Sequence, residues 1–406
     1  MGIDLAGIPL EFVLFGCVLT GVALFHHHTL LIALAGLLAV SVYKIALPGF
    51  PEGSGLGGFL AHLQHEWVTV ANLLGLLLGF SVLSRHFEES GIPAALPRWL
   101  PEGRAGAFAL LVLVFVMSSF LDNIAAAIIG GTIAATVYAR RVHVGYLAAI
   151  VAASNAGGSG SVVGDTTTTM IWISGVSPMR VLPAYVAAVV ALLFVAWVAS
   201  GQQEAHARMV RAGAETVRIQ IDRVLIVGLI LAAAIAANVG VNAIAPARAG
   251  DFPFVGTAVW VAILVSAPRC RPDWSVLPGA FRGSVFLLSL VLIASMMPVD
   301  RLPAASWSTT LGLGFVSAVF DNIPLTALAI AQGGYDWGLL AYSVGFGGSM
   351  LWFGSSAGVA LSHAFPAVRS VAEWVHHGWH VAVGYVLGFF ALWLTLGWNP
   401  ATPGPG

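Results

Sequence analysis

The sequence predicts an all-α polytopic membrane protein built from two inverted-topology repeats, each with five transmembrane helices, one re-entrant hairpin and one broken helix. Composition indicates the class: of 406 residues, 58% are hydrophobic and only 9% are charged. A soluble domain carries about 25% charged residues, so this chain is suited to lipid rather than water. Polar motifs that recur in both halves of the chain indicate the internal repeat.

The recurring motifs are an Asp-Asn pair and a glycine-rich element. The pairs Asp122-Asn123 and Asp321-Asn322 each lie in the middle of a long apolar stretch. Residues 157–166 then read Gly-Gly-Ser, four residues, Gly-Asp-Thr, and residues 347–356 read Gly-Gly-Ser, four residues, Gly-Ser-Ser. An ionisable side chain inside a membrane segment costs free energy, so its presence there is by default a sign of function.

The first repeat is expected to cover residues 1–200. A crossing needs about 20 apolar residues, and simple spans of this kind lie at 8–25, 29–47, 67–84 and 180–199. The run at about 105–139 is long enough for two crossings but has no polar loop, only the residues from Ser118 to Asn123. A hairpin that enters the membrane and turns back explains both features. A helix broken by the glycine-rich element follows at about 143–177.

The second repeat, residues 223–406, follows the same plan after a polar cytoplasmic linker at 201–222. It has a hairpin at about 305–332 and a broken helix at about 337–365. Its simple spans lie at 223–241, 252–267, 281–298 and 379–397. Because each repeat crosses an odd number of times, the second repeat starts on the opposite side of the membrane, and the repeats must be inverted.

The distribution of basic residues tests this topology. With the N-terminus outside, 13 of the 17 Lys and Arg residues face the cytoplasm, and only Lys44, Arg180, Arg248 and Arg301 face the exterior. This bias is the one that the positive-inside rule demands. We therefore expect a multi-pass protein of a bacterial inner membrane with both termini outside. The first basic residue is Lys44, so we expect no cleavable signal peptide.

The two interrupted regions predict an ion-binding site. Non-helical backbone at membrane depth is tolerated only inside protein or beside a wet cavity, and unwound segments offer the oxygen ligands that small hard cations prefer. We expect each hairpin tip to face the broken helix of its own repeat. The candidate ion- and proton-binding residues are Asp122, Asn123, Asn155, Ser159, Asp165, Thr166, Asp321, Asn322, Ser349 and Ser355. The candidate Na⁺ ligands among them are Asp122, Asp165 and Asp321.

Each candidate also has a structural interpretation. The three aspartates could cap the helices that follow them, but a serine would do so without the charge penalty of burial, which favours a function for the carboxylates. Asp165 is matched by Ser355 in the second half, so the repeats are unequal at this position. Asn123 and Asn322 fit ion binding and the satisfaction of hairpin backbone groups equally well.

Other polar features are interpreted more simply. We interpret the charged cluster as a solvated loop with local ion pairs; its residues are Arg85, His86, Glu88 and Glu89. Two cysteines imply no disulfide framework. No feature of the sequence suggests a nucleic-acid partner or a cofactor, and the expected partners are the transported ions and the lipid bilayer.

A family resemblance is carried by the segment Asn155-Ala-Gly-Gly-Ser-Gly-Ser-Val-Val-Gly-Asp-Thr-Thr-Thr-Thr-Met-Ile-Trp-Ile173, which looks like the signature of the NhaD-type sodium/proton antiporters of the ion transporter superfamily. In the second half it is supported by Val319-Phe-Asp-Asn-Ile-Pro324 and by the glycine-rich run 347–358. The resemblance implies inverted repeats, re-entrant hairpins, broken helices and a homodimer.

The leading functional hypothesis is a secondary active antiporter that exchanges Na⁺ or Li⁺ for H⁺ by alternating access. The cation and the proton would compete for a buried carboxylate, either Asp122 or Asp165, with Asp321 in the pseudo-symmetric site. Na⁺ and H⁺ would be transported ions, not cofactors. The alternative is a Na⁺- or H⁺-coupled carrier of a small anion or neutral oxyacid, of the dicarboxylate or arsenite type. Half-helix N-termini favour anions, but no Lys or Arg lies in a hairpin tip or an unwound segment.

An enzyme is not expected. An intramembrane aspartyl protease needs the motif Gly-x-Gly-Asp, and position 162, two residues before Gly164, is Val.

Overall fold

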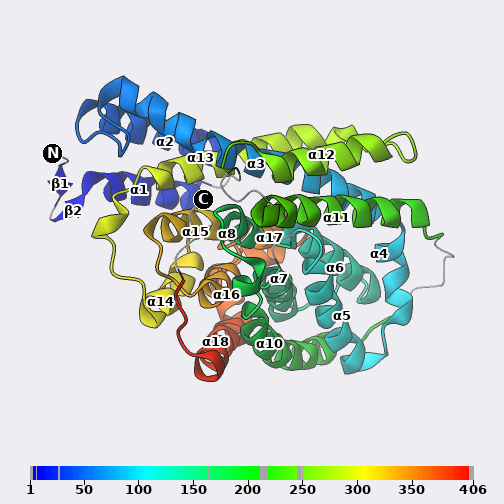
Figure 1. Cartoon of the computed structure of the whole chain (residues 1–406). Coiled ribbons are helices and arrows are strands. Elements are labelled where there is room, and N and C mark those ends of the chain that lie inside the picture. Colours follow the sequence, from blue (N-terminus) through cyan, green and yellow to red (C-terminus); the bar gives the residue numbers. More distant parts are fainter. Residues whose placement is uncertain are drawn as a thin grey trace.

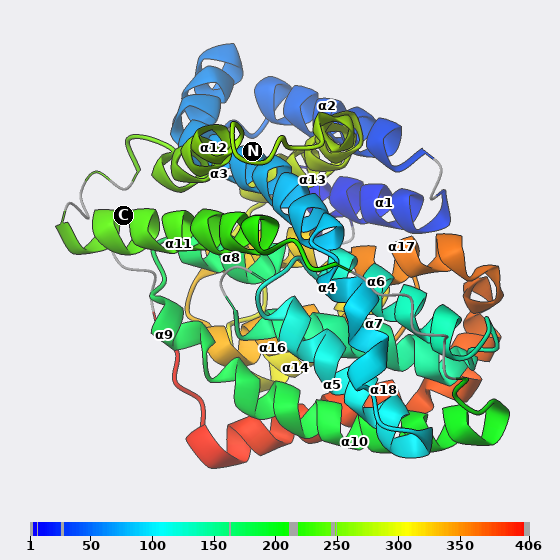
Figure 2. The same cartoon turned by 90° about the vertical axis from the view of Figure 1, so that its right-hand side faces the viewer.

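Two layers of helices make up the molecule. The computed structural model describes residues 3–5, 7–25, 28–161, 164–210, 218–244, 248 and 250–401. In Figures 1 and 2 the upper layer holds α1, α2, α3, α11, α12 and α13, and the lower layer holds α5, α6, α7, α10, α14, α16 and α18. The short helices α8, α15 and α17 lie near the boundary between the layers.

The upper layer consists of the first three long helices of each half. These are α1 (Leu10–Leu24), α2 (Thr29–Ala46), α3 (Gly55–Glu89), α11 (Ile221–Ile244), α12 (Phe254–Ser266) and α13 (Leu277–Ser295). Helix α3 contacts α11, α12 and α13, and α13 also contacts α2. An antiparallel pair of short strands, β1 (Asp4–Leu5) and β2 (Ile8–Pro9), precedes α1. The two halves of the chain therefore contribute equally to one layer.

The lower layer contains two helical hairpins. In the first, the residues 119–122 join α5 (Gly103–Ser118) to α6 (Asn123–Val137). In the second, the residues 318–321 join α14 (Trp307–Ser317) to α15 (Asn322–Gln332). Asp122 and Asp321 are the N-cap residues of the returning helices. The helix boundaries thus fall at the two Asp-Asn pairs.

Each hairpin is followed by a helix with an interruption. Six residues separate α7 (Val144–Ser159) from α8 (Thr166–Ile173), and eight residues separate α16 (Trp337–Gly347) from α17 (Ser356–Ala364). The long helices α10 (Ala184–His206) and α18 (Val371–Leu396) close the two halves and pack on each other. The remaining connections contain α4 (Ile92–Ala95), η2 (Leu96–Trp99), α9 (Pro178–Val181), η4 (Trp274–Val276), η5 (Val299–Arg301) and η6 (Pro366–Arg369).

The two halves make matching contacts. Helix α5 packs on α7, as α14 packs on α16, whereas α6 contacts α17 and α15 contacts α8. Glycines allow the closest approaches: a Cβ on Gly157 would collide with the carbonyl oxygen of Phe115, and a Cβ on Gly347 would collide with that of Gly314. Each hairpin therefore touches both interrupted helices.

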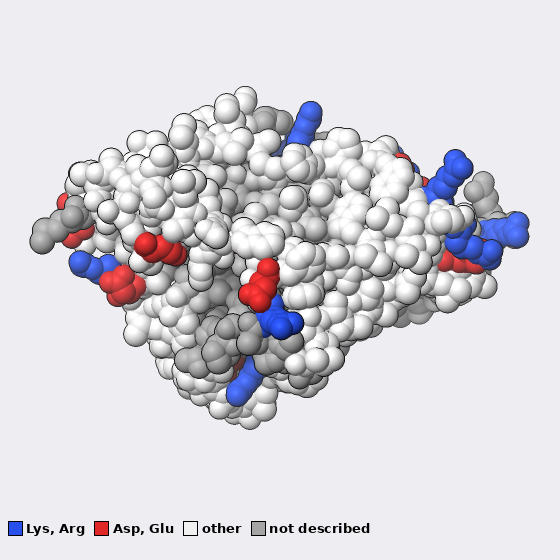
Figure 3. Space-filling view, turned by 45° about the horizontal axis from the view of Figure 1, so that its top comes forward, with Lys and Arg blue, Asp and Glu red and all other residues white. Residues whose placement is uncertain are grey.

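The predicted class, an all-α polytopic membrane protein, is confirmed. Among the described residues, six helices are long and apolar enough to cross a membrane: Thr29–Ala46, Gly55–Glu89, Pro178–His206, Ile221–Val241, Trp274–Ser295 and Val371–Leu396. Charged side chains form only a few separate groups on the face shown in Figure 3, and most of that face is uncharged. Such a surface is suited to contact with lipid.

Two helices extend beyond the apolar windows that predicted them. Helix α3 begins at Gly55 and not near residue 67, and α18 begins at Val371 and not near residue 379. The extra turns of α3 carry His62, which contacts Glu52 and Ser295, so tertiary contacts support helix where the sequence is polar. With 35 residues, α3 is about 52 Å long at 1.5 Å per residue, which exceeds the ~30 Å hydrocarbon core.

The linker predicted at 201–222 is shorter in the structure. Helix α10 continues to His206 and α11 begins at Ile221. Residues 211–217 of this linker lie outside the described residues.

Replacement of Gly157 by alanine is expected to lower the free energy of unfolding by about 1–3 kcal/mol, the usual cost of overpacking, because the new methyl group would collide with the Phe115 carbonyl. Gly228→Ala in α11 is the matched control, because nothing lies within 4 Å of the added Cβ there. Thermal unfolding in detergent measures both. Equal melting temperatures for the two variants would contradict this packing.

Candidate functional site

The first hairpin tip is bonded to the first interrupted helix through serine hydroxyls. Ser118 donates to the carbonyl oxygen of Ser154 (2.5 Å), and Ser119 donates to that of Gly157 (3.1 Å). The second half has one matching bond, in which Ser317 donates to the carbonyl oxygen of Val344 (2.7 Å). These bonds satisfy carbonyl groups of α7 and α16 and hold each tip against its interruption.

A chain of buried amides then links the two halves. Asn123 Nδ2 donates to Asn155 Oδ1 (3.0 Å), and Asn155 Nδ2 donates to the hydroxyl of Ser349 (2.9 Å). All three side chains are buried. Asn155 therefore joins the tip of the first hairpin to the interruption of the second half.

Asp165 lies at the centre of this arrangement. It is the N-cap residue of α8, and its Oδ1 accepts from the backbone N–H of Thr167 (3.4 Å) and from Asn123 Nδ2 (3.5 Å). The residue is 3% exposed, and its second oxygen, Oδ2, is buried without a hydrogen-bond partner. An unsatisfied buried polar atom costs about 1–3 kcal/mol, and more when charged. One oxygen of the Asp165 carboxylate is therefore buried without a hydrogen-bond donor.

Asp321 is held differently. Its Oδ1 accepts from the backbone N–H of Ile323 (3.1 Å), and its Oδ2 accepts from the hydroxyl of Ser356 (3.1 Å). The neighbouring Ser355 caps α17 through Gly358 N–H (3.3 Å). Both oxygens of Asp321 therefore have partners, unlike those of Asp165.

A cavity of about 370 Å³ opens at this site, between the upper and lower layers. Its lower wall is made by Asp122 and Asn123 of the first hairpin, Asp165 and Thr166 of α8, and Asn322 of α15. Its upper wall is made by α3 and α13, mostly with apolar side chains. The polar groups of the two halves thus meet in one space.

The structure brings most of the predicted residues together. Hydrogen bonds connect Asn123, Asn155, Asp165 and Ser349, and the expected pairing of the second hairpin tip is present as Asp321 with Ser356. The hydroxyl of Ser159 is buried and bonds to the carbonyl of Ala156 (2.8 Å) in its own helix.

The three aspartates do not form a shared metal cluster. Within the described part of the chain, no group of three or more His, Cys, Asp or Glu side chains is placed to hold one metal ion. A cation at this site would therefore need neutral oxygens in addition to at most two carboxylates.

Polar residues of the upper layer line the cavity, although the sequence did not assign them to the site. Ser81, Ser84 and Glu88 of α3 and Ser284 of α13 line the cavity. The spacing of three and four residues in Ser81, Ser84 and Glu88 places them on one helix face, so the signal was present. It was overlooked because serines are common in membrane helices, where they bond to their own backbone, as Ser81 does to Leu77.

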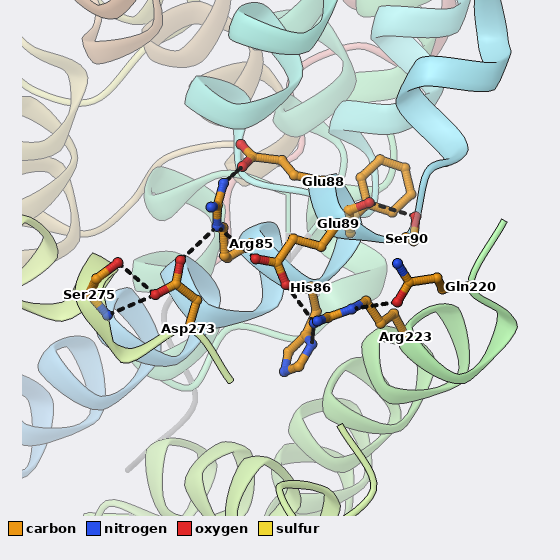
Figure 4. Close-up of polar contacts among 10 residues, drawn as sticks. Arg85, His86, Glu88, Glu89, Ser90, Gln220, Arg223, Asp273 and Ser275 are labelled. Carbon is orange, nitrogen blue, oxygen red and sulfur yellow. Dashed lines mark hydrogen bonds and ion pairs between the residues drawn. The ribbon is translucent and has the colours of Figure 1, made fainter. Parts of the chain in front are cut away.

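Glu88, which lines the cavity, belongs to a charged network (Figure 4). Arg85 contacts Glu88 (3.2 Å), Glu89 (3.2 Å) and Asp273 (3.0 Å). Hydrogen bonds from Ser275 and then from Arg85 hold the pKa of Asp273 below its usual value, which keeps it ionised. The predicted ion pairs are present, but Arg85, Glu88 and Glu89 lie in the last turns of α3 and not in a loop.

No protein-family model matches the chain. Sodium/proton antiporter 1 of Arabidopsis thaliana is 26% identical over 373 residues, which are 80% of this chain and 61% of that protein. The Na⁺/H⁺ antiporter NhaD of Vibrio parahaemolyticus is 26% identical over 353 residues, which are 75% of this chain and 85% of that protein.

The resemblance to NhaD-type sodium/proton antiporters is confirmed. A third relative, the Na⁺/H⁺ antiporter NhaD of Halomonas elongata, is 34% identical over 110 residues, or 26% of this chain. The chain spans less than two thirds of the length of the Arabidopsis protein. All three relatives are named as transporters, in agreement with the expectation that this chain is not an enzyme.

Replacement of Asn155 by alanine is expected to destabilise the fold by about 1–3 kcal/mol, because Asn123 and Ser349 would each lose a buried partner. A double-mutant cycle with Ser349→Ala isolates the link between the halves. We expect a coupling free energy of about 0.5–3 kcal/mol from thermal unfolding. Strictly additive effects would show that the bond contributes nothing.

Proposed function

We propose that this chain is a secondary active transporter that exchanges Na⁺ or Li⁺ for H⁺ in a bacterial inner membrane. The observation that carries the proposal is the carboxylate of Asp165, which is buried, has one oxygen without a hydrogen-bond partner, and belongs to a residue that lines a cavity between the two layers. Asp122 lines the same cavity. The names of the relatives agree with this activity.

The proposed chemistry is a competition for one negative charge. A carboxylate takes either a proton or a small hard cation, and carbonyl, amide and hydroxyl oxygens complete the cation's shell. Asp165 is the first candidate because one of its oxygens is free, and Asp122 is the second because it lines the cavity. Asp321, whose oxygens both have partners, holds the second hairpin tip against α17.

The proposed movement is alternating access. The hairpins enter the membrane without crossing it, the two repeats are inverted, and the lower layer moves against the upper layer. Glu88, on the side to which the basic residues assign the cytoplasm, lines the cavity, and we propose that the described conformation faces inward. A homodimer, which the family resemblance implies, completes the proposed assembly.

An anion carrier is less well supported. No Lys or Arg is among the described residues that line the cavity, whereas Asp122, Asp165 and Glu88 are. An anion in this space would meet carboxylates without a balancing cation, which is electrostatically unfavourable.

The transport test uses purified protein in proteoliposomes with an internal pH dye and an imposed pH gradient. NaCl or LiCl should dissipate the gradient and choline chloride should not. Asp165→Asn and Asp122→Asn should each lower the rate by at least about tenfold, which corresponds to about 1.4 kcal/mol.

Asp300→Asn serves as the matched control, because the Asp300 side chain is 80% exposed and the residue does not line the cavity. It should transport like the unmodified chain. No response to any cation by folded protein would sink the antiporter proposal and favour the oxyacid carrier.

The proposed orientation is tested by cysteine labelling. With Cys17 and Cys270 replaced by serine, Asp251→Cys should react with a membrane-impermeant maleimide in intact spheroplasts, because it lies in a predicted external loop. Arg271→Cys should react only after permeabilisation. Both residues are exposed, which makes the pair comparable. The reverse pattern would contradict the assigned orientation.

A further inference from the structure

The two interruptions differ at most of their equivalent positions, and two of these differences bear on Asp165. Counted from the shared Gly-Gly-Ser, Asn155 of the first half corresponds to Gly345 of the second, and Asp165 corresponds to Ser355. The surrounding contacts match, since Ser118 and Ser317 make the same bond to Ser154 and Val344. The differences are therefore local substitutions within a common backbone arrangement.

Gly345 directly faces the carboxylate of Asp165. A Cβ built on Gly345 would lie 3.3 Å from Asp165 Oδ2 and 3.6 Å from the Cβ of Ser159. Residue 345 lies inside α16, where glycine is among the poorest helix formers. Its backbone conformation does not demand glycine, because Gly345 has no positive φ. The glycine therefore matters for the space beside Oδ2.

The oxygen at that space is the one without a partner. Oδ1 of Asp165 accepts from Asn123 and from Thr167 N–H, while Oδ2 is buried and unbonded. If the second half repeated the asparagine of the first, an amide at position 345 would lie beside Oδ2 and could donate to it. The glycine removes that donor, and Oδ2 is left without a hydrogen-bond partner.

We propose that Gly345 is a specificity-determining residue of the cation site, because its missing side chain leaves room for Na⁺ at Asp165 Oδ2. This inference rests on the proposed antiport function. A hard monovalent cation is the fitting ligand, since the free group is a carboxylate oxygen. Li⁺ is smaller than Na⁺ and needs less space, so a side chain at position 345 should weaken the binding of Na⁺ more than the binding of Li⁺.

The test compares Gly345→Ala and Gly345→Ser in proteoliposomes, with half-saturating concentrations of NaCl and LiCl as the readout. Gly345→Ala should raise the half-saturating Na⁺ concentration by about tenfold, equivalent to about 1.4 kcal/mol. It should raise the half-saturating Li⁺ concentration by clearly less. Gly345→Ser should weaken the binding of both ions more strongly than Gly345→Ala does, because the serine hydroxyl can donate a hydrogen bond to Oδ2. Gly312→Ala is the control, since nothing lies within 4 Å of a Cβ there.

Binding is measured separately from transport, as the rise in melting temperature on adding NaCl in place of choline chloride. The rise should shrink in both Gly345 variants and persist in Gly312→Ala. If alanine does not yield folded protein, the serine variant decides, because its hydrogen bond to Oδ2 offsets the crowding.

Unchanged half-saturating concentrations of Na⁺ and Li⁺ in a folded Gly345 variant would overturn the inference but would not contradict the proposed antiport function. A wild-type chain without any Na⁺- or Li⁺-driven proton movement would instead overturn the proposed function, on which the inference rests.

Discussion

Backbone that leaves the helical path inside a membrane must find its hydrogen bonds within the protein, because lipid offers none. Here the hairpin tips supply hydrogen bonds to carbonyl groups of the interrupted helices. Ser118 and Ser317 bond to carbonyls of α7 and α16, and glycines let the backbones approach closely enough for these bonds. Because each hairpin also contacts the second segment of the opposite interrupted helix, the four elements form one unit. The carboxylates are fixed in position by that unit.

Within it, the two halves have diverged in chemistry while keeping their packing. Both carboxylate oxygens of Asp321 accept hydrogen bonds, one from Ile323 N–H and one from Ser356, and these bonds hold the second hairpin tip against α17. Asp165 of the first half has one buried oxygen without a hydrogen-bond partner. That oxygen lies next to Gly345 of the second half, which is equivalent to Asn155 of the first half. A free carboxylate oxygen destabilises the empty site, and binding of a proton or a cation relieves that cost. This difference between the halves is the physical basis for assigning exchange to one carboxylate.

Much of this arrangement was predictable from the sequence, since Asp, Asn and glycine in apolar stretches have few interpretations. Asp122 and Asp321 indicated where helices begin, and Asn155 and Asp165 indicated the interruption. Two features were not predictable. The bond from Asn155 to Ser349 joins residues 194 positions apart, and no local pattern specifies which partners meet across a fold. The role of α3 in the cavity was also missed, because Ser81, Ser84 and Glu88 become informative only when a cavity faces their side of the helix.

The central claim is that a cation and a proton compete for Asp165. The most direct measurement is proton release from purified protein in weakly buffered detergent solution, followed with a pH indicator as NaCl is added. Binding of Na⁺ should release protons near neutral pH, choline chloride should release none, and the Asp165→Asn variant should lose the Na⁺-dependent signal while staying folded. Proton release that is absent in the unmodified protein, or undiminished in the variant, would contradict the account.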